Sequence, residues 1–212
     1  MAKFCGALKY CDAVSVHPYR YPSAPEDKVA GMTLVEEMKN IKTLIGKYSG
    51  KQNIWITEVG WPTHKGSRET TETDQARMLV RAHVLMLSTG VVEKLFWYDL
   101  MDDGAGRAYN ENNFGILRNA KFNCMPKPAY SAYAVMSSLL SGADFVKERN
   151  FHADALAFEF KTASGTVIAA WSPKTSAAVA VPAGMKVIDM MGNTLGAGAV
   201  TLTASPVYFA VK

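Results

Sequence analysis

Apolar positions between residues 33 and 48 follow a helical period. Thr33 and Glu36 have the spacing of a capping box, in which each side chain bonds the backbone N–H of the other residue. Gly50 stands where such a helix would end. The pattern predicts an amphipathic helix, because its apolar residues recur three or four positions apart. They are Leu34, Val35, Met38, Ile41, Leu44, Ile45 and Tyr48.

Shorter apolar runs alternate with helical patterns through the first two thirds of the chain. The run Ile54-Trp55-Ile56 is nearly continuous in apolar character, as in a parallel strand that is buried on both faces. This alternation favours an α/β fold, in which crossover helices join parallel strands. The expected elements are strands at 12–16, 53–57 and 94–98, and helices at 33–48, 71–88 and 126–141.

The pattern changes at about Gly142, where short β-favouring runs begin to follow one another. Turn signals such as Ser164-Gly165 and Gly192-Asn193 separate the runs. This pattern predicts a small antiparallel β-sandwich domain over 142–212, which follows an α/β domain over 1–141. The runs cover 155–161, 166–172, 177–181, 185–190, 199–203 and 207–211.

Composition and charge narrow the classes of partner. Hydrophobic residues make up 49% of the chain and charged residues 20%, as in ordinary soluble domains. The net charge of +4 comes from Lys and Arg residues spread along the sequence, so nucleic acid is not an expected partner. No apolar run approaches the roughly 20 residues of a membrane-spanning helix. The N-terminus also lacks the apolar segment of a signal peptide, which predicts a cytoplasmic location by default.

Cysteine and histidine residues show no metal-binding spacing. Cys5, Cys11 and Cys124 are an odd number, which favours free thiols in a reducing compartment. The four histidines are scattered along the chain. We therefore expect neither a metal ion nor another cofactor.

The three expected strands of the α/β part end in side chains that suit a sugar-binding site. The carboxyl ends of the strands in a parallel barrel meet at one face, so these side chains are expected to converge. Taken singly, each also has a structural interpretation, as a loop hydrogen-bonding residue, a salt-bridged residue or part of the core. They are His17 and Tyr19 after the first strand, Glu58 and Trp61 after the second, and Trp97 and Asp99 after the third.

The same segments resemble the clan-A glycoside hydrolases, whose catalytic domain is a (β/α)8 barrel. The sixth barrel strand of that clan is similar to DAVSVHPYRYPSAPED, the seventh to IWITEVGWPT and the eighth to KLFWYDLMDDG. The last barrel segment before an appended β-domain resembles NFGILRNAKFNCMPKPAYSAYAVMSSLL. Family 39-like β-xylosidases and cellulase-like groups are the most similar members. The resemblance implies a partial (β/α)8 (TIM) barrel of about three βα units, which match strands six to eight, and relatives that are often secreted.

The resemblance also implies a retaining hydrolase of small β-linked glycosides. Glu58 takes the place of the nucleophilic glutamate, with His17 and Tyr19 as hydrogen-bond donors that keep it ionised. Trp97 corresponds to the aromatic platform beneath the sugar, facing an open site, whereas Trp55 is expected to pack beneath a helix.

The acid/base is the residue that this resemblance does not supply. Retaining hydrolysis needs a second carboxyl group, about 5–5.5 Å from the first. In the clan this group follows an asparagine at the end of the fourth barrel strand, which has no counterpart here. The Asn110-Glu111 pair follows the eighth-strand segment instead. Glu111 is therefore the best acid/base candidate within the chain, although a loop residue at the edge of the site is the alternative interpretation.

Two classes of function remain open at this point. An enzyme would use Glu111, or a carboxyl group from a second subunit, as its acid/base. A sugar-binding or assembly protein of glycosidase ancestry would hold carbohydrate without turnover. The chain could be the product of a short gene or a fragment of a longer enzyme.

Assembly follows from the expected fold. Three parallel strands cannot close a barrel, and two strand edges would be left unpaired. An inner face built from residues such as Ile54, Ile56 and Leu95 would also be uncovered. We therefore expect a homo-oligomer that acts on a carbohydrate.

Overall fold

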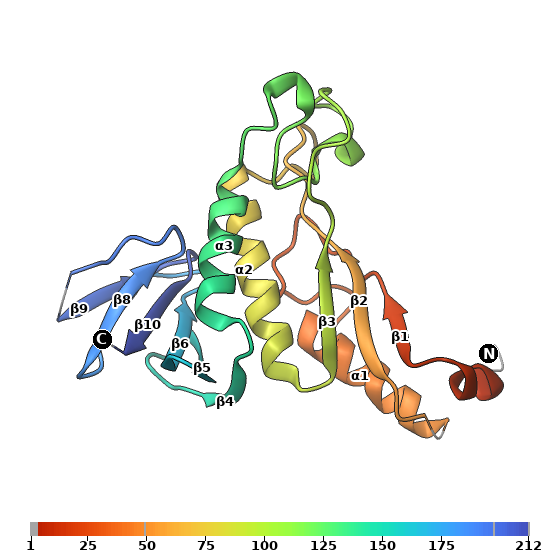
Figure 1. Ribbon diagram of the computed structural model, residues 1–212, viewed down its shortest axis with the longest axis horizontal. Coiled ribbons are helices and arrows are strands. Elements are labelled where there is room, and N and C mark those ends of the chain that lie inside the picture. The colour runs from red at the N-terminus through yellow and green to blue at the C-terminus, as the bar shows by residue number, and fades with distance from the viewer. Residues whose placement is uncertain (1–3, 49, 197, 212) are drawn as a thin grey trace.

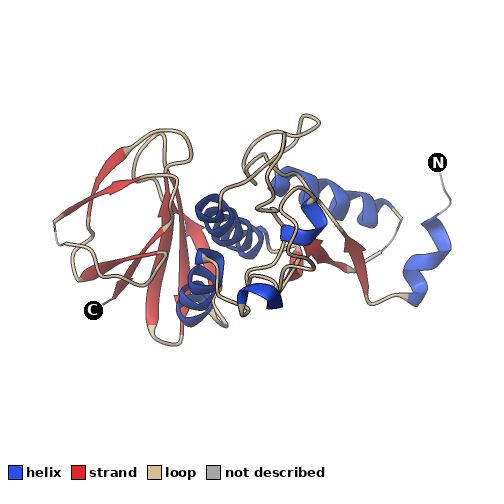
Figure 2. Cartoon of the chain, turned by 90° about the horizontal axis from the view of Figure 1, so that it is seen from above, coloured by secondary structure: helices blue, strands red, loops and turns tan. Residues whose placement is uncertain are grey.

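The computed structural model describes residues 4–48, 50–196 and 198–211. A parallel sheet lies on one side and antiparallel sheets on the other, with two helices between them (Figure 1). Seen from above, these helices separate the two groups of strands (Figure 2). Among the described residues there are also 3-10 helices at Phe4–Tyr10, Asn110–Asn113 and Ala120–Phe122.

The parallel sheet has the strand and helix alternation that the sequence predicts. Its strands are β1 (Ala13–Val16), β2 (Asn53–Val59) and β3 (Val92–Trp97), in the order β1-β2-β3. Both pairs are parallel. The crossover helices are α1 (Leu34–Lys47) and α2 (Glu72–Thr89). The expected α/β organisation of this part of the chain is confirmed.

Local signals fix where the helices begin. Thr33 accepts a hydrogen bond from the backbone N–H of Glu36, and the Glu36 carboxylate accepts one from Thr33, so the predicted capping box is present. Thr71 caps α2 in a similar way, by accepting from the Asp74 N–H. Gly90 ends α2 with φ +66°, a left-handed conformation that costs glycine little.

The two faces of the parallel sheet are the reverse of what we expected. Ile54 and Ile56 are fully buried in the core that the helices cover, and Leu95 packs against that core. Trp55 lies on the opposite, open face, where its ring is 6.5 Å from that of Phe96. The predictions that the isoleucines form the inner face and that Trp55 packs beneath a helix were therefore wrong. A run that is apolar on both faces carries no alternation to distinguish them.

The C-terminal part consists of a helix followed by antiparallel strands. The helix, α3 (Pro128–Leu140), begins at a proline, which suits the first turn. Five strands form one sheet in the order β4-β5-β6-β10-β8, and two form a second sheet, β7-β9. The strands are β4 (Asp144–Glu148), β5 (Leu156–Thr162), β6 (Gly165–Trp171), β7 (Ala177–Ala180), β8 (Met185–Asp189), β9 (Ala199–Leu202) and β10 (Val207–Val211).

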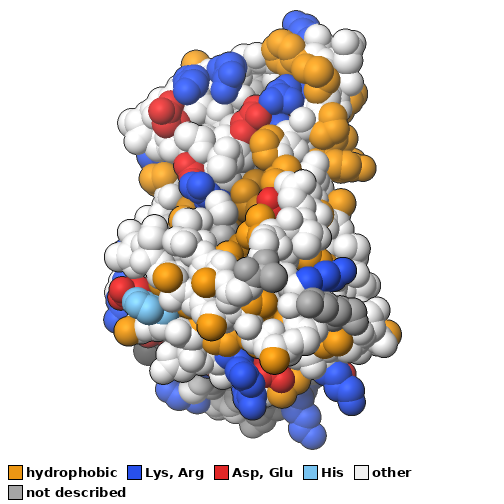
Figure 3. Space-filling view, turned by 90° about the vertical axis from the view of Figure 1, so that its left-hand side faces the viewer, with side chains coloured by type: hydrophobic (Ala, Val, Ile, Leu, Met, Phe, Trp, Pro, Cys, Tyr) orange, Lys and Arg blue, Asp and Glu red, His pale blue; other side chains and the backbone are white. Residues whose placement is uncertain are grey.

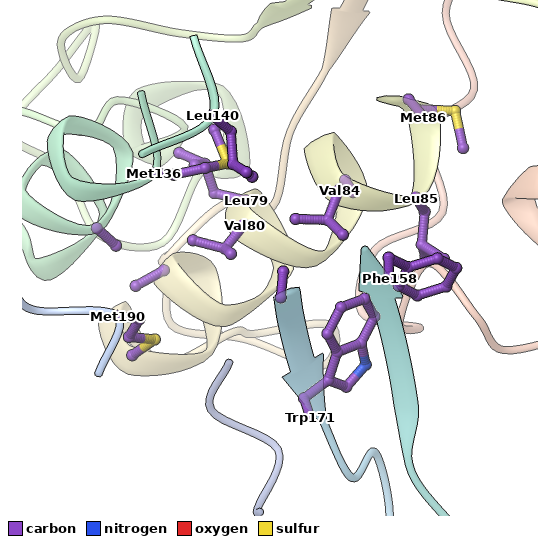
Figure 4. Packing of buried hydrophobic residues seen from close by; sticks show 14 of the residues in the cluster. Leu79, Val80, Val84, Leu85, Met86, Met136, Leu140, Phe158, Trp171 and Met190 are labelled. Atoms are coloured by element: carbon purple, nitrogen blue, oxygen red, sulfur yellow. The ribbon is translucent and has the colours of Figure 1, made fainter. Parts of the chain in front are cut away.

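The central strands of the five-stranded sheet, β6 and β10, are buried on both faces along most of their length. One face packs against α2 and α3, which are apolar where they meet it. The other packs against β7 and β9 around Phe209 and Leu202. A single hydrophobic cluster therefore runs from the parallel sheet through the helices into the antiparallel sheet. The members labelled in Figure 4 are Leu79, Val80, Val84, Leu85, Met86, Met136, Leu140, Phe158, Trp171 and Met190.

A buried polar contact joins the two sides of the molecule as well. Glu26 lies in the loop between β1 and α1, and its Oε1 accepts a hydrogen bond from Nε of Arg81 at 2.8 Å. The same oxygen accepts from the indole N–H of Trp171 at 2.6 Å. The Arg81 side chain is only 2% exposed, so the Glu26 carboxylate, and not water, stabilises its positive charge.

On the face shown in Figure 3, acidic and basic side chains are interspersed with hydrophobic ones. No helix in the described ranges is long and apolar enough to cross a membrane. Cys11 and Cys124 form no disulfide in the part that the structure describes, and the Cys5 side chain lies outside it.

Candidate active site

The carboxyl ends of β2 and β3 are held together by their backbones. The N–H of Tyr98 donates to the carbonyl of Val59 at 2.9 Å. Gly60 passes so close to the carbonyl of Tyr98 that a Cβ on Gly60 would overlap that oxygen. A residue without a side chain is required there, and the close approach fixes the end of one strand against the other.

Glu58 lies within β2, one residue before its end, rather than after the strand as the sequence suggested. Its Oε2 accepts a hydrogen bond from the hydroxyl of Tyr19 at 3.0 Å. Nδ1 of His17 lies 3.5 Å from the same oxygen. The Glu58 side chain is 39% exposed, so the carboxylate is both supported by neighbours and open to a ligand.

Tyr19 is a fixed donor to this carboxylate. Partial burial, the hydrogen bond to Glu58 and the negative charge of Glu58 together raise the pKa of Tyr19 far above its usual range. The hydroxyl therefore stays protonated. The ring is held edge-on by Tyr21, Tyr98 and Phe114, with centroids 5.7 to 6.3 Å away.

Hydroxyl groups on the open face of the sheet continue the contacts of His17. Nε2 of His17 lies 2.8 Å from the hydroxyl of Thr57. That hydroxyl in turn lies 2.5 Å from the hydroxyl of Ser15 on β1. Side chains of β1, of His17 just after it and of β2 thus form a chain of contacts that ends at Glu58.

Glu111 lies in the short 3-10 helix of the long loop after β3. Its Oε1 accepts a hydrogen bond from the side-chain amide of Asn110 at 2.7 Å, and the same amide donates to the hydroxyl of Tyr21. The charges of both Glu111 and Glu58 raise the pKa of Tyr19. The two carboxylates that we singled out therefore lie within electrostatic range of one tyrosine hydroxyl.

Asp99 is a carboxyl group of the site whose pKa is raised into the neutral range. Burial, followed by the charges of Asp103 and Asp102, raises its pKa to about 7, although Lys127 acts in the opposite direction. Its Oδ1 is buried and has no hydrogen-bond partner among the described residues. Asp102 differs, because its carboxylate forms a buried ion pair with the ammonium of Lys127 at 2.7 Å, which gives it a structural role.

The structure corrects the expected orientation of both tryptophans. Trp61 is fully buried, and its indole N–H donates to the carbonyl of Ser23 at 2.9 Å. Trp97 stacks on Trp61 at 5.8 Å and on His83 of α2 at 6.4 Å. Both rings therefore pack on the helix side of the sheet. In this arrangement Trp61 has no exposed surface left for a ligand, and Trp97 does not face the open site.

Tyr98 is the aromatic residue that the sequence reasoning missed. It directly follows Trp97, the last residue of β3. Successive side chains of an extended chain point to opposite faces, so the neighbour of a core-facing Trp97 points toward the site. Its ring packs edge-on against Tyr19 and Phe114. Partial burial and the charges of nearby carboxylates, Glu111 and Glu58 among them, raise the pKa of its hydroxyl. Alternation would have identified it, had the buried face of β3 been known.

Among the described residues, no group of three or more His, Cys, Asp or Glu side chains is placed to hold a metal ion. What the site offers is a half-exposed carboxylate, donors directed at it, an aromatic wall and a second carboxylate nearby. Such groups can perform nucleophilic attack and proton transfer.

Comparison with protein families gives a match over more than half of the chain. A family model described as "Glycosyl hydrolase catalytic core" matches residues 1–120, which include Glu58 and Glu111. Among curated proteins, none matches the chain.

Solved structures of glycoside hydrolases resemble the whole chain. A family 39 glycoside hydrolase from the gut symbiont Bacteroides cellulosilyticus WH2 has a TM-score of 0.83 and 26% identity, over 98% of this chain and 46% of that one. A glucosidase from Croceicoccus marinus has a TM-score of 0.64 and 15% identity, over 99% and 57%. A family 39 β-xylosidase from Caulobacter crescentus has a TM-score of 0.57 and 12% identity, over 99% and 54%. The last two are similar in fold. The chain spans about half the length of these three structures.

Proposed function

The chain belongs to the glycosyl hydrolase catalytic core family, and from this premise we propose that it is a retaining glycoside hydrolase of small β-linked glycosides. Glu58 is the nucleophile. The observation that carries the proposal is the environment of its carboxylate, which accepts from Tyr19, lies beside His17 and remains 39% exposed. Such a carboxylate is held in place and stays accessible to an anomeric carbon.

The reaction that fits these groups has two steps. Oε of Glu58 attacks the anomeric carbon, and the glycosidic oxygen leaves with a proton from the acid/base. Water then cleaves the glycosyl ester, and the same residue accepts the proton. Glu111 is our candidate for that role, because its charge, like that of Glu58, raises the pKa of the Tyr19 hydroxyl and its carboxylate therefore lies near the site. Tyr98 replaces Trp97 as the proposed aromatic surface for the sugar, while His17 and Asp99 remain candidate sugar contacts.

The arrangement of strands and helices also supports an assignment of domains. We infer that β1, β2 and β3 with their helices correspond to three βα units of a (β/α)8 barrel. Residues 1–141 would then be the partial barrel domain and 142–212 an appended β-sandwich domain. The likeness to the family 39 structure, which covers nearly all of this chain, supports this reading. Unpaired edges on β1 and β3 in the described sheet support a homo-oligomer.

A second candidate function is carbohydrate binding without turnover. The observation that favours it is the position of Glu111, which lies in a loop and is already bonded to the Asn110 amide. A mechanism-based 2-fluoro glycoside with an activated leaving group distinguishes the two functions. The leaving group departs with little acid assistance, so a nucleophile alone is enough to form a covalent glycosyl adduct.

We expect intact-mass measurement to show one covalently bound sugar on the wild type and none on Glu58→Gln, which removes the nucleophile at constant volume. Glu148→Gln is the matched control, since Glu148 is an exposed glutamate of β4, in the antiparallel sheet. Labelling of all three proteins to the same extent would reject Glu58 as the nucleophile. Sugar binding with no adduct on the wild type would favour the second function.

A further inference from the structure

Thr57 and Ser15 have no part in the proposed reaction, yet their hydroxyls are linked to it through His17. Thr57 Oγ1 lies 2.8 Å from His17 Nε2, and Ser15 Oγ lies 2.5 Å from Thr57 Oγ1. The other ring nitrogen, Nδ1, lies 3.5 Å from Oε2 of Glu58. One ring therefore has a hydroxyl chain on one side and a carboxylate on the other.

The number of protons in this chain restricts its arrangement. A neutral imidazole has one N–H and one acceptor nitrogen, and a hydroxyl has a single proton to donate. If Nδ1 lacked a proton, its lone pair would face the negative charge of Glu58 at 3.5 Å. A proton on Nδ1 replaces this repulsion by attraction. Nε2 must then accept, and the hydroxyl of Thr57 is the group within hydrogen-bond distance of it.

The order of donors follows from that choice. Thr57 spends its only proton on Nε2, so its oxygen is left to accept from the hydroxyl of Ser15. Every donor in the chain then points toward the carboxylate. The 3.5 Å separation is longer than a direct hydrogen bond, so the effect of His17 on Glu58 in the free protein is mainly electrostatic.

We propose that Thr57, supported by Ser15, is a positioning residue that holds His17 as the Nδ1–H tautomer and aims this N–H at the nucleophile Glu58. The role of Glu58 as nucleophile comes from the proposed function, on which this inference rests. The tautomer itself is a property of the free protein and can be observed without any turnover.

The test is the tautomer of His17, read from the ¹⁵N chemical shifts of the imidazole ring in histidine-labelled protein at about pH 8, where an ordinary histidine is neutral. The chain has four histidines, so the spectrum of a His17→Gln variant identifies the signals of this ring. We expect the wild type to be mainly in the Nδ1–H form. In Thr57→Val, which keeps the β-branched shape and removes the hydroxyl, that form should lose its majority.

Three variants separate positioning from a general structural effect. Thr57→Ser keeps the hydroxyl and should restore the Nδ1–H form. Glu58→Gln removes the charge that selects the tautomer and should weaken the preference while the hydroxyl chain stays intact. Thr43→Val is the matched control, because the Thr43 hydroxyl bonds the Lys39 carbonyl within α1 and no other group among the described residues. It should leave the His17 signals unchanged.

A wild-type protein that is mainly in the Nε2–H form would overturn the inference, as would a Thr57→Val spectrum identical to that of the wild type. Where the protein hydrolyses aryl glycosides, Thr57→Val should lower kcat about tenfold or more with little change in KM, because the other tautomer turns a lone pair instead of an N–H toward Glu58. A correct tautomer in a protein without turnover would contradict the proposed function and leave the positioning role standing.

Discussion

At the scale of single residues, the site is defined by how each acidic side chain is partnered. The Glu58 carboxylate accepts a hydrogen bond from Tyr19, whose hydroxyl stays protonated at ordinary pH. The Glu58 side chain is also 39% exposed to solvent. Asp102 is buried against Lys127 and is not free to act on a ligand. Asp99 has a raised pKa and an oxygen without a partner in the described chain. Neighbouring carboxyl groups of similar sequence context therefore have different chemistry, which is set by what they contact.

Glu111 is tested best by varying the leaving group. A general acid matters when the leaving oxygen is basic and matters little when it departs readily. We expect Glu111→Gln to lower kcat/KM for an alkyl β-glycoside by about 10²–10⁴-fold and to leave kcat/KM for an activated aryl glycoside nearly unchanged, because this ratio reports the first step, in which the leaving group departs. Steady-state kinetics on the two substrates measures both values, with Glu148→Gln as the control. Equal losses on both substrates would assign Glu111 a structural role.

Asp99 gives the site a specific dependence on pH. Its pKa is raised from 3.8 to about 7 in the folded protein. Between these values the unfolded chain has lost a proton that the folded protein still binds, so the free energy of unfolding falls as the pH rises through this window. Asp99→Asn cannot titrate and should lack this loss.

Urea unfolding at a series of pH values measures the difference. The stability of the wild type should decline relative to Asp99→Asn from about pH 4 to about pH 7 and then remain parallel to it. Curves that stay parallel across the whole window would show that Asp99 has an ordinary pKa.

At the scale of elements, the sequence revealed helices and strand order better than it revealed faces. The capping box of Thr33 and Glu36 was readable because both partners are local and three residues apart. Strand β4 was missed because all its residues are exposed, so its sequence has no buried alternation. The orientation of β3 was also missed, and with it the proposed role of Tyr98, because the identity of a buried face depends on helices that pack there from other parts of the chain.

The two tryptophans of the parallel sheet provide a direct test of the corrected faces. Trp97 packs between Trp61 and His83, so Trp97→Ala removes a ring from the core and should lower the free energy of unfolding by about 3 kcal/mol. Trp55 lies on the open face beneath the ammonium of Lys94, and Trp55→Ala should cost roughly half as much. Chemical unfolding of both variants measures this order. A larger loss for Trp55→Ala would restore the orientation that the sequence first suggested.

At the scale of the whole molecule, one side of the parallel sheet is covered and the other is not. The helices and the antiparallel sheet share a single hydrophobic cluster with β2, and Glu26 links Arg81 to Trp171 across them. The two proposed domains are therefore closely packed against each other. The open face carries hydroxyl, histidine and aromatic side chains instead of the aliphatic ones that we had expected, which reduces the cost of its exposure without removing it.

This open face and its two edges are the reason to expect self-association. Phe96 is 48% exposed on the open face, next to Trp55, and β1 and β3 each lack a neighbour on one side in the described sheet. Backbone donors and acceptors on such edges pair readily with another strand.

We expect light scattering after size-exclusion chromatography to give a small multiple of 23.1 kDa for the wild type. Phe96→Asp should shift the mass toward the monomer, because it places a charge in the contact. Leu44→Asp is the control, since Leu44 is 51% exposed on α1, a crossover helix, and its variant should keep the mass of the wild type. A wild type that stays monomeric at low micromolar concentration would show that the polar groups of this face are enough to keep it in water.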